Sequence, residues 1–145
     1  MIIATNKRAF FDYEMLETTE AGIELRGFEV KAARSGKINL SGSYVVMRGG
    51  EAWLLNCDIA PYQPQNIPEK YEAKRTRRLL LKKAQIADFA EKMREKGLTL
   101  LPLKVYTKNR NLKLEIGLGR SRRKKDKRDI LKKREAQREM DRTAE

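Results

Sequence analysis

Strict alternation of apolar and polar residues near the end of the chain restricts the fold more than any other feature. In LKVYTKNRNLKLEIGLG, residues 103–119, leucine or isoleucine occupies every second position from 112 to 118, and lysine, glutamate and glycine stand between them. A period of two gives a β-strand one apolar and one polar face. The segment therefore predicts an antiparallel hairpin packed on a core through one face.

Two further segments have the same character. SYVVMRGGEAWLLNCDI, residues 43–59, contains Gly49–Gly50, which supply the positive φ angles that a tight hairpin turn requires. Residues 10–25 begin with the strand formers FFDYEMLE, and the following TTEAG predicts a hairpin that turns near Glu20–Gly22. The proline-containing segment APYQPQNIPEKYEAK, residues 60–74, is predicted to be a loop.

Two segments favour helices instead of strands. EVKAARSGK, residues 29–37, predicts a short helix that ends at Gly36 and carries Lys31 and Arg34 one turn apart on one face. RTRRLLLKKAQIADFAEKMREKG, residues 75–97, has apolar residues at helical spacing and predicts a longer helix that ends at its final glycine.

Three hairpins with a helix inserted late predict a mainly β fold. We expect an OB-fold-like closed antiparallel barrel of about six strands with flanking short helices in residues 1–119, because closure removes exposed strand edges. Trp53 and Tyr106 lie inside strand patterns and are predicted to be core residues. After Gly119 the apolar rhythm stops, so we expect residues 120–145 to form a basic tail that is disordered alone and becomes helical when its charges are neutralised.

The charge of the chain points to a polyanionic partner. The formal net charge is +13 over 145 residues, which exceeds what solubility requires and destabilises a compact state. Nucleic acid is the first candidate and an anionic membrane surface the second. The sequence contains no long apolar run and no signal-peptide pattern, and its single cysteine fits a reducing compartment, so we expect a cytoplasmic protein.

The absence of histidine limits the possible chemistry. Without imidazole the chain has no Ser-His or Cys-His nucleophilic pair and no histidine metal site. Catalysis would depend on carboxylates or lysines, and the acids are scattered. We expect no enzymatic activity, no cofactor and no metal, although an RNA-processing enzyme with carboxylate-bound Mg²⁺ is an alternative.

Two basic stretches are candidate RNA contacts. NKRAFF, residues 6–11, offers either phosphate and base contacts beside stacking rings or merely the charged start of a strand. KRTRRLLL, residues 74–81, puts cations at an expected helix start, where the helix dipole disfavours them, and this cost favours a function. One of its three leucines is expected to be exposed, where it could pack on an unstacked base.

The tail segment RSRRKKDKRDILKKR, residues 120–134, contains ten basic and two acidic side chains. It could be a solvated charge run, a membrane anchor or an arm for one partner. A membrane anchor is disfavoured because the tail has no bulky apolar face and no lipidation motif. The candidate contacts in it are Arg122, Arg123, Lys124, Lys125, Asp126, Lys127, Arg128, Lys132, Lys133 and Arg134.

Many short motifs occur in order along the chain. They are IATNKRAFFDYE, GIEL-x-G-x-EVK, R-x-GK-x-NL-x-x-SYV, GEAWL-x-N, I-x-PY, RTR-x-LLL, G-x-TL-x-PL, Y-x-KN and DKR. Together they resemble the SmpB family, the SsrA-binding proteins of bacterial trans-translation, from about Ile3 to Arg138. The resemblance implies a non-catalytic OB-fold adaptor that binds the tRNA-like domain of tmRNA; we expect the protein to be a monomer. It also implies delivery of alanyl-tmRNA, with elongation factor Tu, to stalled ribosomes.

The resemblance also implies which residues bind. The matching tmRNA-binding positions, with their basic neighbours and the two cations of the short helix, are Asn6, Lys7, Arg8, Glu20, Lys31, Arg34, Arg75, Arg77, Arg78 and Leu80. The tail is expected to contact 16S rRNA of the small ribosomal subunit, in the empty mRNA channel near the decoding centre. Lys125 and Ala136 stand where the family often has histidine and tryptophan. The alternative is a general OB-fold protein of the ribosome without selectivity for tmRNA.

Overall fold

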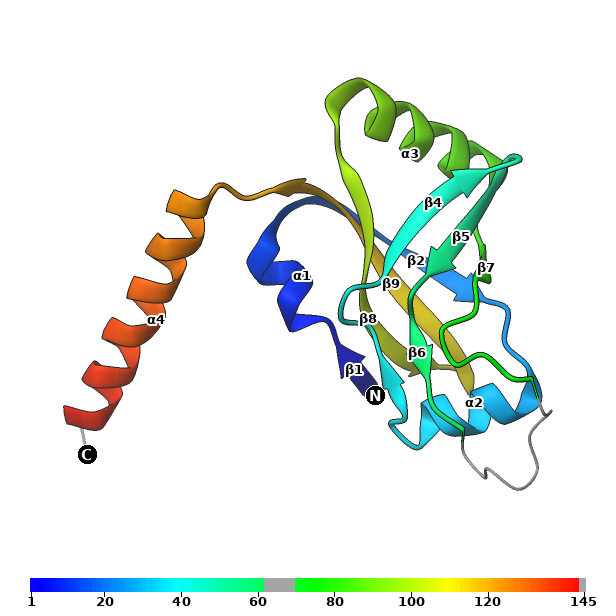
Figure 1. Cartoon of the computed structure of the whole chain (residues 1–145), viewed down its shortest axis with the longest axis horizontal. Coiled ribbons are helices and arrows are strands. Elements are labelled where there is room, and N and C mark those ends of the chain that lie inside the picture. The colour runs from blue at the N-terminus through cyan, green and yellow to red at the C-terminus, as the bar shows by residue number, and fades with distance from the viewer. Residues whose placement is uncertain (62–69, 144–145) are drawn as a thin grey trace.

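The structure of the chain is a computed structural model that describes residues 1–61 and 70–143. Figure 1 shows a body of strands flanked by helices, from which one long helix projects. In chain order the elements are β1 (Ile2–Thr5), α1 (Lys7–Asp12), β2 (Tyr13–Ile23), α2 (Gly27–Arg34), β3 (Ile38–Asn39), β4 (Tyr44–Arg48), β5 (Glu51–Leu55), β6 (Asp58–Ile59), β7 (Arg77–Leu80), α3 (Lys83–Lys96), β8 (Thr99–Lys108), β9 (Asn111–Ser121) and α4 (Lys124–Thr143).

The body is built on one large antiparallel sheet. Its seven strands follow the order β1-β8-β4-β5-β7-β2-β9, and β8 pairs with β9 in addition. The pairings therefore run in a cycle from β8 through β4, β5, β7, β2 and β9 back to β8. The short strands β3 and β6 form a separate two-stranded sheet. The prediction of a mainly β fold with flanking short helices is confirmed.

Alternate residues of the strands form the apolar core, as the period of two predicts. Leu54 of β5, Leu79 of β7 and Ile116 of β9 are fully buried. Helix α2 adds Ala32 and Ala33 to the same cluster, and α3 adds Ile86 and Phe89. The two helices thus cover apolar surface that the strands alone would leave in water.

Two of the three expected hairpins are confirmed. Strands β4 and β5 turn at Gly49–Gly50, whose φ angles are 61° and 74°. Strands β8 and β9 turn at Asn109 and Arg110, which both have positive φ angles.

The hairpin expected at Glu20–Gly22 is wrong. Strand β2 continues unbroken to Ile23, because β9 offers a partner of equal length and pairs with it from Ser121 back to Leu114. Gly22 marks a close approach between strands. A Cβ atom on Gly22 would lie 3.1 Å from the Cβ atom of Leu80 on β7.

The two helices of the body differ in how well the sequence predicts them. Helix α2 ends just before Gly36, which has a φ angle of 88°, as expected. The helix expected over residues 75–97 is only partly correct, because its first residues form β7. Arg77 and Leu79 of β7 point inward while Leu80 points outward, which is strand alternation. Helix α3 starts after Lys82 and ends at Gly97.

Within the loop predicted over residues 60–74, residues 62–69 lie outside the described part of the chain. Residues 70–76 contain neither helix nor strand, as expected.

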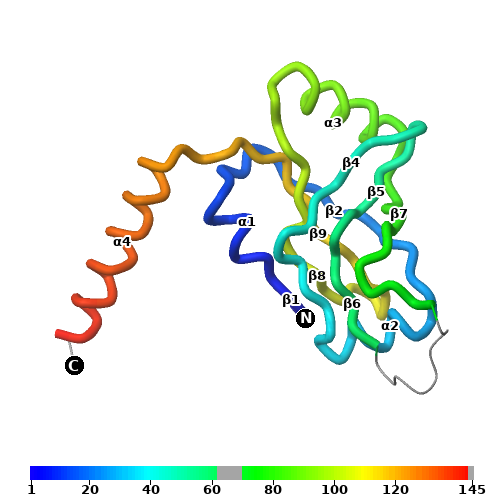
Figure 2. The backbone as a smooth tube through the Cα atoms, viewed as in Figure 1, coloured from blue at the N-terminus to red at the C-terminus, as the bar shows by residue number. Residues whose placement is uncertain are grey.

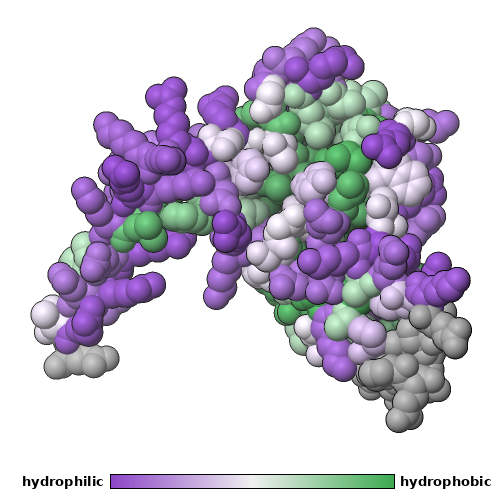
Figure 3. Space-filling model, viewed as in Figure 1, coloured by the Kyte–Doolittle hydropathy of each residue, from purple (hydrophilic) through white to green (hydrophobic). Residues whose placement is uncertain are grey.

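Most of the basic tail forms helix α4. Strand pairing extends to Ser121, and α4 begins at Lys124. Residues 122–143 contain neither glycine nor proline and are rich in strong helix formers. Its first turns also contact α1, which adds tertiary support. The tube in Figure 2 shows α4 projecting from the body, and Figure 3 shows hydrophilic side chains along most of it.

Candidate nucleic-acid interface

Asn6 is the cap of α1 and lies in the interior. Its Oδ1 accepts a hydrogen bond from the backbone N–H of Ala9 at 3.1 Å. Its Nδ2 donates to the carbonyl oxygens of Leu40 at 3.2 Å and Pro102 at 2.9 Å. This corrects the prediction that Asn6 is a surface contact, because its side chain is buried and fully used in holding α1 against β8.

Asn6 instead places the two cations that follow it. Lys7 and Arg8 stand on the exposed side of α1, and the Arg8 side chain is 74% exposed. Arg8 Nε lies 3.3 Å from Asp12 Oδ2, one turn further along the helix. The residues of NKRAFF thus form a helix rather than the start of a strand, and their two charged side chains are available to a phosphate backbone.

Arg77 belongs to a buried ion cluster. Its guanidinium is 0% exposed and donates to Glu29 Oε2 through Nε at 2.9 Å and Nη2 at 2.6 Å. It also donates to the carbonyl oxygens of Cys57 and Ala73. The prediction that Arg77 contacts RNA is corrected, because every bond it makes lies inside the protein.

Glu29 of α2 is the acceptor at the centre of this cluster. It also accepts hydrogen bonds from the Arg75 guanidinium, the Tyr71 hydroxyl and the backbone N–H of Arg26. Burial raises the pKa of Glu29, but these donors and Arg77 outweigh it and lower the pKa from 4.5 to about 2. The carboxylate stays charged, and Arg75 donates to it through Nε and Nη2. Both arginines therefore serve mainly to tie α2 to β7 and the residues just before it.

Lys31 and Arg34 are exposed on α2. Arg34 donates through Nη2 to the backbone carbonyl of Arg110 in the β8–β9 turn. Only the remaining donors of Arg34 are therefore directed at solvent.

The outer side of β2, β7 and β5 brings together several of the predicted residues. We call it the β2–β7–β5 face; it consists of Glu20, Glu24, Glu51, Trp53, Arg78 and Leu80. Leu80 is 46% exposed and lies opposite Gly22 of β2, and Gly22 is two residues from Glu20 along that strand. Arg78 pairs with Trp53 of β5 across the ladder. An exposed leucine beside an arginine and a carboxylate offers apolar contact, cation and acceptor within one surface.

The Glu20 carboxylate is held in place by residues of β8. Its Oε2 accepts hydrogen bonds from the Tyr106 hydroxyl and from Lys108 Nζ at 3.4 Å. The hydrogen bond from Tyr106 is the largest of the effects that lower the pKa of Glu20, and Lys108 and Lys113 add to it. An exposed carboxylate that remains ionised accepts hydrogen bonds from RNA amino or hydroxyl groups without losing a proton first.

Arg78 is shared between two acids. Its Nε donates to Glu51 Oε2 at 3.0 Å, and its Nη1 donates to Glu24 Oε1 at 2.9 Å. The hydrogen bond to Glu51 is the first cause of the raised pKa of Arg78, followed by the bond to Glu24. The two carboxylates fix the plane of the guanidinium while leaving one of its sides to the solvent.

Trp53 and Tyr106 are two further residues that the sequence reasoning assigned wrongly. Both are half exposed on the outer side of the sheet, whereas the prediction placed them in the core. The alternation already contained the correct signal. Trp53 has the same parity as Glu51, and Tyr106 has the same parity as Lys108, so each shares the polar side of its strand.

Of the ten predicted tail contacts, Arg122 and Arg123 precede α4 and the other eight lie on it; α4 has no buried residue. Lys127 and Arg122 are half-buried, and the other predicted contacts in the tail are exposed. Lys127 Nζ lies 3.1 Å from Asp12 Oδ1 and 6.0 Å from the centre of the Phe11 ring. The guanidinium carbon of Arg134 lies 5.7 Å from the same centre. These contacts hold α4 beside α1 through charge and cation–π attraction.

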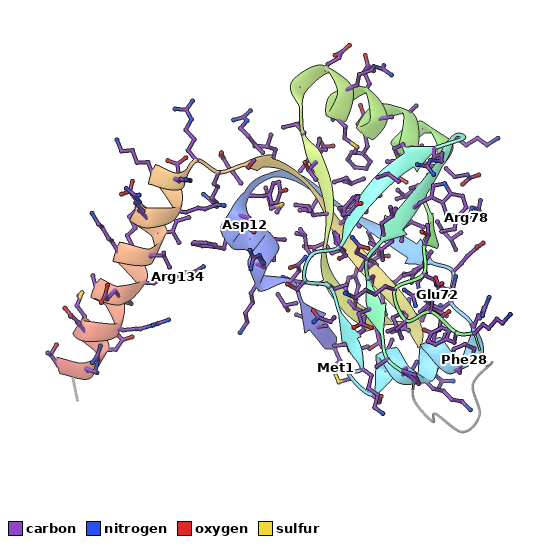
Figure 4. The ribbon with its side chains drawn as sticks, in the orientation of Figure 1. Met1, Asp12, Phe28, Glu72, Arg78 and Arg134 are labelled. Atoms are coloured by element: carbon purple, nitrogen blue, oxygen red, sulfur yellow. The ribbon has the colours of Figure 1, made fainter. Side chains whose placement is uncertain are left out.

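The predicted residues do not form one patch. Helix α1 joins β2 at Tyr13, whereas β7 pairs with Gly22 and Ile23 at the other end of this strand. An extended strand of this length spans about 30 Å. Figure 4 accordingly shows Asp12 and Arg134 on the opposite side of the body from Arg78. The predicted residues thus fall into two separate regions.

Neither region resembles a metal centre. Within residues 1–61 and 70–143, no three acidic or cysteine side chains are grouped so that they could hold a metal ion. The described helices include none that is both long and apolar enough to cross a membrane.

The fold and the net charge of +13 define a small basic β-sheet protein whose surface suits the binding of a polyanion. The chain belongs to the SmpB protein family, whose model matches residues 3–145.

Individual relatives match over almost the whole chain. An SsrA-binding protein of Nostoc punctiforme is 46% identical over 141 residues, covering 97% of this chain and 91% of the relative. An SsrA-binding protein of Chlorobaculum tepidum is 50% identical over 137 residues, covering 94% and 87%. The fold also matches a chain of a solved structure described as "tmRNA-SmpB: a journey to the center of the bacterial ribosome". That match has a TM-score of 0.69 and 41% identity, and covers 88% of this chain and 93% of that one.

Proposed function

We propose that this protein is a non-catalytic adaptor that binds the tRNA-like domain of tmRNA and brings it to stalled ribosomes in trans-translation. Similarity over nearly the whole chain to proteins named SsrA-binding protein is the observation that carries the proposal. The likeness to a chain described with tmRNA and the bacterial ribosome supports the ribosome as the second partner. Alanyl-tmRNA would arrive with elongation factor Tu, and the adaptor would act in the cytoplasm.

The body of this adaptor is a closed barrel of the OB type. The cycle of antiparallel pairings from β8 through β4, β5, β7, β2 and β9 back to β8 supports closure, since every strand of the cycle has two partners. A closed sheet offers a rigid outer face, on which side chains keep their positions when RNA binds.

The tmRNA contacts belong to the β2–β7–β5 face. Glu20 and Leu80 give it selectivity: the carboxylate accepts donors from bases or ribose hydroxyls, and the leucine packs on an unstacked base. Glu24 and Glu51 balance the charge of Arg78, so the positive charge comes from Lys31 and Arg34 of α2. Asn6 and Arg77 act indirectly, by holding α1 and β7 in place.

The ribosomal contacts belong to α4. Its cations project to several sides and none of its residues is buried, so a surrounding ring of phosphates could engage most of them. A narrow channel lined with 16S rRNA fits such a helix better than a flat surface does. Lys125 and Ala136 leave this contact to charge rather than to aromatic stacking.

Separable loss of the two activities tests the proposal. A chain lacking residues 123–145 retains β9 and the hydrogen bond from Arg122 to Asp12, so its body should fold. It should bind tmRNA with nearly the affinity of the full chain at physiological salt, yet fail to support tagging of stalled peptides.

Leu80→Ala should do the reverse and weaken tmRNA binding. Leu16→Ala is the matched control, because Leu16 is equally exposed on the opposite end of β2. Wild-type affinity of both leucine variants, or loss of tmRNA binding on truncation, would contradict the two-surface proposal.

The exposed cations on α1, α2 and α4 favour a second candidate, a general RNA-binding protein of the ribosome. Such a protein would hold RNA by charge and scarcely discriminate. Competition of labelled tmRNA with bulk tRNA separates the two functions. An equal competition constant for both RNAs would favour the general binder.

A further inference from the structure

Trp53 occupies an unusual position for the one tryptophan of the chain. Its neighbours along β5, Ala52 and Leu54, are fully buried, whereas the indole lies on the outer side, half exposed. Across the ladder it stands between Val46 of β4 and Arg78 of β7. An apolar contact with the core therefore does not explain its large aromatic surface.

The indole is fixed in orientation. Its Nε1–H donates to the carbonyl oxygen of Arg48 at 3.1 Å, at the end of β4. The Gly49–Gly50 turn that follows positions this carbonyl. A ring anchored through its only polar atom loses little entropy when a ligand stacks on it.

Two hollows adjoin at Trp53. One has a volume of about 550 Å³ and includes Val46 and Leu55. The other has a volume of about 540 Å³ and includes Ile23 and Leu25. Trp53 and Thr76 line both, so the indole is the wall between them. Each volume suits a group of the size of a nucleoside.

The hollows combine apolar walls with cationic rims. Arg48 lies at the edge of the first, and Arg26 and Arg78 lie at the edge of the second. Arg48 and Arg26 are exposed, so their charges are presented to the solvent. The acids nearby, Glu24 and Glu51, are engaged by Arg78. A flat, uncharged group with an anionic group attached fits this arrangement, and an RNA nucleotide has that chemistry.

The geometry points to Trp53 as a stacking platform for an unpaired nucleobase of the bound RNA, with the adjoining phosphate held by Arg48 or Arg26. The inference rests on the proposed function in that tmRNA is the RNA concerned. It adds a site to the β2–β7–β5 face, about two strands from Glu20, and explains why that face carries a tryptophan. The bound RNA must therefore present at least one unstacked base there.

Because Trp53 is the sole tryptophan, its fluorescence reports on this site in the unaltered full chain. Short single-stranded oligoadenylate and tmRNA should both quench it on titration, because a stacked base quenches indole emission. An RNA duplex of the same length should not. Absence of quenching at saturating tmRNA, with binding verified by filter retention, would overturn the inference.

A substitution gives the second measurement. Trp53→Leu keeps apolar volume but removes the aromatic face, and should weaken oligoadenylate binding about five- to 150-fold, the range for one stacked base. Tyr44→Leu is the matched control, because Tyr44 is an exposed aromatic residue of the neighbouring strand β4. Unchanged affinity of a folded Trp53→Leu chain would refute the platform.

If Trp53→Leu does not fold, the fluorescence titration of the wild-type chain still tests the platform. Trp53→Phe is then the second variant, and it should lose less oligoadenylate affinity because it keeps an aromatic face. Quenching by a ribosomal protein but not by RNA would assign the hollows to a protein partner and refute the inference. Quenching by oligoadenylate without preference for tmRNA over tRNA would leave the platform intact and refute the proposed function.

Discussion

Replacing Glu29 with glutamine removes the negative charge from the centre of the buried cluster. Glutamine keeps the shape, but it replaces one of the two acceptor oxygens with an NH₂ donor and leaves the guanidinium of Arg77, which is 0% exposed, without a counter-charge. Breaking a buried ion pair in this way costs about 3–5 kcal/mol, because the remaining charge is left without compensation. Against a total unfolding free energy of about 5–15 kcal/mol for a domain, the loss is large.

The lowered pKa of Glu29 expresses the same effect as a dependence on pH. The difference between the ordinary value of 4.5 and about 2 in the folded protein corresponds to about 3 kcal/mol. Since the folded-state pKa is the lower one, this stability is fully present above pH 4.5 and is lost as the pH falls through about 2. The Glu29→Gln variant has no such carboxyl, so its deficit should be largest at neutral pH and shrink in acid.

Urea unfolding followed by far-UV circular dichroism at pH 7 and at several acidic values measures the deficit. The double variant Glu29→Met/Arg77→Met is the control, since removing both charges together should restore much of the stability. A neutral-pH deficit of Glu29→Gln below about 1 kcal/mol would refute the reasoning, since that is the worth of an ordinary hydrogen bond. A deficit independent of pH would refute its electrostatic part.

Three further predictions concern other parts of the molecule. Gly117→Ala should destabilise the fold by about 1–3 kcal/mol in thermal unfolding, because the new Cβ atom would lie 2.6 Å from Leu103 Cδ1; an unchanged melting temperature would contradict this. Tyr106→Phe should weaken tmRNA binding, measured by filter retention, because Glu20 loses the donor that holds it; equal affinity would show that Glu20 needs no such support. Asp12→Asn should loosen α4 from α1, seen as faster amide exchange in the first turns of α4, and unchanged exchange would mean that the ion pair is not what holds it.

Alternation and turn chemistry predicted much of the fold from sequence. Gly49–Gly50 and the alternating leucines of β9 are strong local signals, and the hairpins they indicate are present. Gly22 misled the prediction because glycine also occurs where two strands approach closely, and only the position of Leu80 distinguishes that role from a turn. The β7 segment looked helical because three consecutive leucines fit either period.

The candidate site was less predictable than the fold. Arg77 and Arg78 are adjacent cations of the same type, yet one is buried on Glu29 and the other is exposed, because consecutive strand residues point to opposite sides. Local composition could not identify Glu29 as the acceptor, since 48 residues separate it from Arg77. The parity of Trp53 with Glu51 indicates the outer side of the sheet, whereas its hydrophobicity indicates the core, and in the structure the parity decides.

The long basic helix has a mechanical consequence. Helix α4 has 20 residues and is therefore about 30 Å long, while its contacts with α1 through Lys127 and Arg134 reach only to its middle. A rotation of about 10° at α1 would displace the far end of such a helix by about 5 Å. Helix α1 also carries Lys7 and Arg8. An anion that bound these two cations and tilted α1 would therefore redirect the far end of α4, which is about three times as long as α1.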